Sequence, residues 1–175
     1  NHEWLFQIIV YSIHKFSGPD GLLTMQVILV SVTMMILLFL GYNKEKQLGS
    51  IFILLLVSIV YQGRFTLRPD LYSLLFFALY IFILSFYIDK KWSVYALFII
   101  QVLWSNMHGF FFFGPLFVMI GLGAEFIKRH VKLPYEWNKT GRLTDDEYRR
   151  LKLILGVVIF ACLFNPATFK GAWYP

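Results

Sequence analysis

The sequence predicts an all-α protein, a polytopic transmembrane helical bundle of about six full spans plus one short re-entrant or interfacial helix. Three observations lead to this fold class. Hydrophobic residues occupy 58% of the 175 positions, a larger share than soluble domains carry. They gather in successive apolar runs, and the loops between these runs are alternately rich and poor in Lys and Arg. Each span is expected to be helical, because a helix satisfies its own backbone hydrogen bonds in lipid.

The first apolar run, residues 4–16, is shorter than the roughly 20 residues that a standard crossing needs. It therefore predicts a tilted, re-entrant or interfacial helix. The sequence SGPDG at 17–21 predicts a turn, since Gly and Pro favour turn backbone. Residues 22–40 follow as a full-length apolar run.

Five further apolar runs complete the predicted bundle, at 51–61, 71–88, 94–105, 110–126 and 151–164. We expect residues 1–175 to form a single transmembrane domain, with a cytoplasmic loop at 127–152. This domain is expected to be part of a longer protein, because the sequence begins without Met and stops soon after an apolar run.

Lys and Arg residues indicate the orientation of the bundle, since cytoplasmic loops carry an excess of both. Twelve of them lie in loops that share one side if each span from residue 22 onward crosses once, namely 41–49, 89–91 and 127–152. Three lie in the loops of the other side, namely 63–70, 105–109 and 165–175. The basic-rich side is therefore expected to be cytoplasmic. This distribution also accounts for the net charge of +6 without a nucleic-acid partner.

Asn106 and His108 stand out within the apolar stretch FIIQVLWSNMHGFFFFG, residues 98–114. A polar group in hydrocarbon is costly unless it is satisfied or faces water. One interpretation is that Asn106 caps the helix starting at Phe110, while His108 reaches the lipid head groups. The other is that the helix breaks at Gly109 and points both side chains into an outer-face cavity. There they would bind an anionic head group or a sugar hydroxyl.

Arg64, Arg68 and Asp70 form a second group of candidate binding residues. Arg on the basic-poor side runs against the expected bias, and guanidinium groups bind phosphate through paired hydrogen bonds. A lipid phosphate is therefore one candidate ligand. A local pair of Arg68 with Asp70, or an interfacial anchor, is the alternative. Pro69 is expected to start the next helix, with Asp70 in its first turn.

His2 and Glu3 directly precede the first apolar run. Both are candidate catalytic residues. Glu3 could be a general base or a metal ligand, and the alternative is a negative charge at a helix N-terminus. Asn165 is a further candidate binding residue, beside a helix stop at Pro166. No metal site is predicted, because the four His residues are scattered and Cys162 is the only cysteine.

Four motifs occur in order along the chain: NHEWL at 1–5, RPDLYS at 68–73, LWSNMHGFF at 103–111 and NPAT at 165–168. Together they resemble motifs of a bacterial group in the GT-C class of membrane glycosyltransferases. This group is related to the protein O-mannosyltransferases and the lipid A aminoarabinose transferases. Its members commonly show HEWL, RPQLFS, LWANLHGGF and NPYG. The chain departs from this pattern at Phe110, where the family has Gly, and at Ala167 and Thr168, where it has Tyr and Gly.

The resemblance implies an enzyme that transfers a sugar from a polyprenyl-phosphate-linked donor on the extracytoplasmic face of a bacterial inner membrane. It implies that Arg64, Arg68 and His108 line the cavity for the lipid phosphate or the sugar. A divalent cation is a candidate cofactor. The family's catalytic acid lies in the first outer loop, which would precede Asn1, and Glu3 stands at the end of that loop.

Two other functions fit the same sequence features. A transporter or flippase of a lipid-linked sugar would use the same Arg and His residues without a catalytic carboxylate. A non-catalytic scaffold subunit of a larger membrane complex would tolerate substitutions at those residues. All three functions imply contact with membrane lipids, and the first two imply a polyprenyl-phosphate-linked sugar as a partner.

Overall fold

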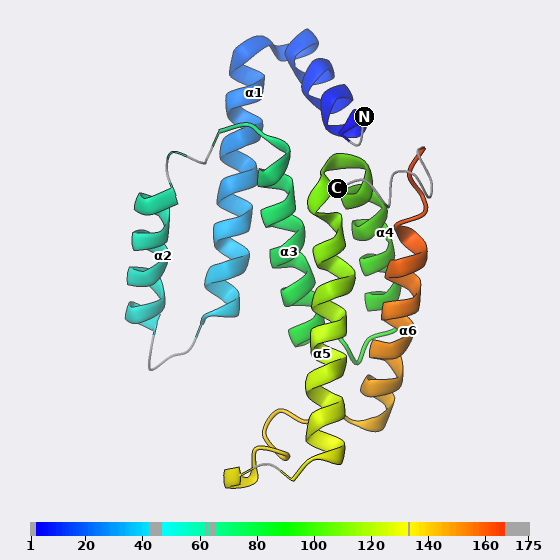
Figure 1. The fold of residues 1–175 in the computed structure, drawn as a ribbon. Helices are drawn as coiled ribbons and strands as arrows, with labels where there is room; N and C mark the ends of the chain where they lie inside the picture. Colours follow the sequence, from blue (N-terminus) through cyan, green and yellow to red (C-terminus); the bar gives the residue numbers. More distant parts are fainter. Residues whose placement is uncertain (1–2, 43–46, 62, 64–65, 133, 167–175) are drawn as a thin grey trace.

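The computed structural model describes residues 3–42, 47–61, 63, 66–132 and 134–166, and every regular element in those ranges is helical (Figure 1). The predicted all-α fold class is therefore confirmed. Within these ranges six α-helices follow one another, and their connections include the short 3-10 helices η2 (Gly109–Phe112) and η3 (Pro134–Glu136).

Helix α1 (Trp4–Leu40) contains a sharp kink at Gly18, where φ is 60° and ψ is −157°. Gly adopts this backbone without the penalty that a side chain would bring, and Pro19 is suited to the first turn of the helix that resumes after it. The sequence predicted a turn over residues 17–21, and in the structure the chain is helical on both sides of a kink at Gly18. Figure 1 shows that the two arms of α1 fold back on each other at this point.

The other helices run alternately up and down the bundle in Figure 1: α2 (Gln47–Tyr61), α3 (Pro69–Phe86), α4 (Trp92–Met107), α5 (Phe113–His130) and α6 (Asp145–Ala161). Helix α3 packs against α1 and α4, and α6 packs against α4 and α5. Pro69 begins α3 and Asp70 lies in its first turn, as the sequence predicted.

The connections between helices gather at the two ends of this bundle (Figure 1). We call the end formed by Glu3, 66–70 and 108–112 the His108 end. The opposite end, formed by 87–91 and 131–144, is called the basic end. Both groupings agree with the alternation of loops that the sequence predicted.

In the part of the chain that the structure describes, three helices are long and apolar enough to cross a membrane: α1, α3 and the segment Gly109–His130 that joins η2 to α5. The expectation of about six full spans was too high. The apolar runs at 51–61 and 94–105 lie in α2 and α4, of 15 and 16 residues, both shorter than a standard crossing. Helix α6 has 17 residues and starts with three acidic side chains. The apolar helices support membrane association of the chain.

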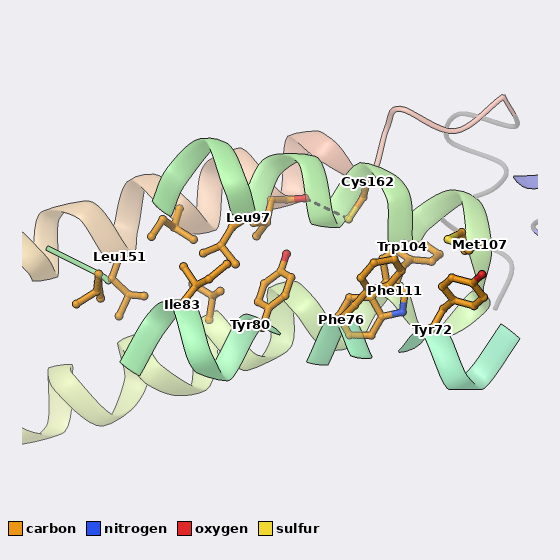
Figure 2. Close-up of a cluster of buried hydrophobic side chains, with 14 of the residues drawn as sticks. Tyr72, Phe76, Tyr80, Ile83, Leu97, Trp104, Met107, Phe111, Leu151 and Cys162 are labelled. Carbon is orange, nitrogen blue, oxygen red and sulfur yellow. Dashed lines mark hydrogen bonds between the residues drawn. The ribbon is translucent and has the colours of Figure 1, made fainter. Parts of the chain in front are cut away.

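The core of the bundle is a column of apolar and aromatic side chains between α3, α4 and α6 (Figure 2). Tyr72, Phe76 and Tyr80 are spaced four residues apart on α3, so they share one helix face. Trp104 of α4 lies against this face, with its ring centroid 5.9 Å from Phe76 and 5.8 Å from Tyr80. This packing fixes the position of α4 close to its last turn, where the polar residues begin.

A buried polar network holds three helices together in the middle of the bundle. Gln101 accepts a hydrogen bond from the Tyr80 hydroxyl at 2.6 Å and donates to the Phe111 carbonyl at 2.9 Å and to Cys162 Sγ at 3.2 Å. Gly114 gives the network room, because a Cβ there would overlap Gln101 Oε1. Gln101 is fully buried, and these bonds supply its side-chain amide with the hydrogen-bond partners that lipid does not offer.

Candidate functional site

The residues that the sequence singled out converge on the His108 end, and His108 occupies its centre. Helix α4 ends at Met107, and His108 follows with extended backbone, φ −155° and ψ 149°. The expected helix break therefore lies at His108, directly before Gly109. His108 Nδ1 is 2.7 Å from the Ser73 hydroxyl, and Trp104 Nε1 donates to the same hydroxyl at 2.8 Å.

This chain of contacts orients the imidazole ring. When Ser73 accepts from Trp104 and donates its own proton to His108 Nδ1, the proton of the neutral ring lies on Nε2. Nε2 faces the Glu3 carboxylate, 3.9 Å from Oε1. Glu3 stands at the N-terminal end of α1, so the fold-back of α1 at Gly18 brings it to the end of α4.

Burial lowers the pKa of His108 below its ordinary value, and the negative charges of Glu3 and Asp70 oppose this shift without reversing it. His108 is therefore a neutral ring at neutral pH. A neutral imidazole can exchange hydrogen bonds with a hydroxyl group, whereas it has no charge with which to attract a phosphate.

Asp70 lies beside a pocket of about 510 Å³ at the same end. The pocket is lined by Asp70, Ser73, Leu74, Phe77, Trp104, Phe110 and Phe113. The Asp70 Oδ1 atom is buried and has no hydrogen-bond partner within the described part of the chain. The alternative interpretation of the sequence was a local ion pair of Arg68 with Asp70. The described part of the chain contains no such ion pair.

Asn106 has a structural role in this arrangement. It accepts a hydrogen bond from Trp4 Nε1 at 2.8 Å and donates to the carbonyls of Val102 and Phe164, each at 2.7 Å. Both amide protons are used inside the protein and only 4% of the residue is exposed. Asn106 therefore ties α1, α4 and the end of α6 together. It neither caps the following helix nor opens into the pocket described above.

Asn165 forms a similar link. Its side-chain amide donates to the Ser105 carbonyl at 2.6 Å, and the residue is buried. Arg68 precedes α3 with an exposed side chain and extended backbone. Arg64 and His2 were also predicted to belong to the site, and both lie outside the described residues.

A divalent cation finds no ready site in the described ranges, because no three His, Cys, Asp or Glu side chains gather there to hold one. We therefore derive no step through a metal ion.

Sequence reasoning missed Ser73 and Trp104, which orient His108. Helical spacing offered a signal for both. Ser73 lies three residues after Asp70, and Trp104 lies four residues before His108, so each pair can share a helix face. Contact between Ser73 and Trp104 depends on how α3 packs against α4, and no local sequence pattern predicts that packing.

The fold and this site together define a helical, membrane-associated protein in which Glu3, Asp70 and His108 lie at the basic-poor end of the bundle. Comparisons with models of known protein families, with curated proteins and with solved structures find no match to this chain.

Proposed function

We propose that this chain is the membrane-embedded part of a glycosyltransferase of the GT-C type. It would transfer a sugar from a polyprenyl-phosphate donor on the extracytoplasmic face of a bacterial inner membrane. The observation that supports this proposal best is the neutral, oriented imidazole of His108 beside the Glu3 carboxylate at the basic-poor end of the bundle. The four ordered motifs provide the link to glycosyl transfer.

The reaction is a substitution at the anomeric carbon of the donor sugar. A nucleophilic oxygen of the acceptor attacks this carbon and loses its proton to a base. The bond between the carbon and the phosphate oxygen breaks, and the prenyl phosphate leaves with the bonding electrons. The base would be the family's acidic residue, and Glu3 would assist it from the edge of the site. His108 would hold a sugar hydroxyl through Nε2, because Nδ1 is already bonded to the Ser73 hydroxyl.

Arg68 is assigned to the departing phosphate. Its side chain is exposed at the His108 end, where a head group at the membrane surface can reach it. A guanidinium stabilises the negative charge that develops on the phosphate as the bond breaks. The prenyl chain of the donor would stay in the lipid around the bundle.

Transfer of labelled sugar from a synthetic polyprenyl-phosphate donor by the full-length protein in membranes tests this function. Replacing Arg68 with Ala removes a charged phosphate contact and should lower kcat/KM by roughly tenfold or more. His108→Gln should lower it as well. The matched control is Lys90→Ala, which removes an exposed cation at the basic end and should leave kcat/KM unchanged.

Each competing function gives a different outcome. A flippase would move the labelled donor across sealed vesicles without releasing prenyl phosphate. A scaffold subunit would tolerate both site variants in every activity measured. Either result would reject the glycosyltransferase proposal.

A further inference from the structure

The aromatic pocket beside Asp70 is not used by the proposed transfer chemistry. His108 does not line it, and neither does Glu3. It lies between the N-terminal half of α3, the last turn of α4 and the segment 110–113. Its ligand can therefore be inferred from its own residues, independently of glycosyl transfer.

A buried carboxylate oxygen needs a partner, because removing its hydration without replacement costs several kcal/mol. Asp70 Oδ1 has no hydrogen-bond donor within the described ranges of the chain. His108 uses Nδ1 for Ser73 and points Nε2 toward Glu3, so neither ring nitrogen serves Asp70. The oxygen is thus available to a donor that the ligand supplies.

Aromatic side chains make up most of the remaining wall. Phe110 and Phe113 stand edge to face, with centroids 5.8 Å apart, and they are 49% and 38% exposed. Phe77 and Trp104 complete the wall from α3 and α4. Aromatic faces attract cations, most strongly where water is excluded. Because Phe110 and Phe113 are partly exposed, the pocket is open to the surroundings of the bundle.

We propose that this pocket binds the primary ammonium group of a ligand, with Asp70 accepting its hydrogen bonds and the aromatic rings packing around it. A carboxylate excludes phosphate from the same position by charge. A hydroxyl group would satisfy one hydrogen bond but would leave the negative charge unbalanced. The ammonium can belong to a lipid head group such as ethanolamine or to a soluble amine.

Native mass spectrometry of the full protein tests the lipid source. The protein is mixed with equimolar phosphatidylethanolamine and phosphatidylglycerol of identical acyl chains, and the ratio of retained lipids is measured. The net charge of +6 favours the anionic lipid non-specifically, so a preference for phosphatidylethanolamine requires a specific site. We expect roughly tenfold enrichment of phosphatidylethanolamine, which Asp70→Asn should abolish.

Thermal unfolding of the same protein in ethanolamine hydrochloride tests the soluble source, with sodium chloride at equal ionic strength as reference. A rise in Tm that Asp70→Asn removes would support a soluble amine as the ligand. The control for both measurements is Asp89→Asn, which changes an exposed carboxylate at the basic end. Wild-type protein that shows neither lipid enrichment nor a rise in Tm would overturn the proposal, as would effects that persist in Asp70→Asn.

Discussion

Asn106 and His108 are two residues apart in the sequence, yet they have different roles. Asn106 uses its amide protons for two backbone carbonyls and its oxygen for Trp4, so it holds three helices together. His108 keeps one ring nitrogen directed toward Glu3. The sequence showed that both polar groups needed an explanation. It could not separate them, because the partners that distinguish them, Ser73 for His108 and Trp4 for Asn106, lie 35 and 102 residues away in the chain.

The lowered pKa of His108 predicts how stability depends on pH. The unfolded chain takes up a proton near the ordinary His pKa of 6.5, whereas the folded protein resists protonation to a lower pH. The stability from this residue is fully present above the unfolded pKa of 6.5 and is lost as the pH falls from there to the lower pKa of the folded protein. Between about pH 7 and pH 5, His108→Gln should therefore show a smaller fall in Tm than the wild type.

The control for this measurement is His130→Gln, which replaces an exposed histidine at the other end of α5. It shows what the replacement of a histidine outside the His108 end does to the slope of Tm against pH. An identical slope in His108→Gln and wild-type protein would contradict the assigned shift.

Helix starts and breaks could be predicted where a single residue type determines the backbone. Pro69 begins α3, and Gly18 breaks α1 next to Pro19, as their chemistry indicated. The contact of the Gln101 side chain of α4 with Gly114 at the start of α5 could not be predicted in this way. It depends on how separate helices are placed, and not on the sequence of either one.

Gly114→Ala tests this close contact. The added Cβ would overlap Gln101 Oε1 and lie 3.0 Å from the Tyr80 hydroxyl, so the buried network must shift. We expect destabilisation of about 1–3 kcal/mol, measured as the midpoint of denaturant unfolding in detergent. Gly123→Ala on the same helix is the control, because a Cβ there meets nothing within 4 Å. That variant should be neutral or stabilising by up to about 1 kcal/mol. Equal effects of the two variants would argue against the network.

At the scale of the whole molecule, hydropathy identified a membrane-associated helical protein and overestimated the number of full spans. Apolar runs such as 94–105 looked like crossings, yet α4 is short and shares its buried face with α6. Burial inside a bundle and burial in lipid require similar residues, so composition alone does not distinguish the two.

The fold-back of α1 leads to a labelling prediction. Ser17 is exposed next to the kink, and Tyr42 is exposed just after the other end of α1. Single cysteines at these positions, in a Cys162→Ala background, should react with an impermeant maleimide from opposite sides of sealed vesicles. These positions avoid Gly18, whose positive φ disfavours a side chain. Labelling of both cysteines from the same side would show that the second arm of α1 does not cross.

A change in the backbone torsions at Gly18 would rotate the whole first arm of α1 about the kink. Residues 4–17 extend for about 20 Å at the usual helical rise, and Glu3 is at the far tip. A rotation of about 10° at Gly18 would swing that tip through roughly 3–4 Å, given this arm length. This displacement is comparable to the 3.9 Å that separates Glu3 from His108. The φ and ψ torsions of Gly18 thus set the distance between the Glu3 carboxylate and the His108 imidazole. The Trp4–Asn106 hydrogen bond restrains the tip of the arm.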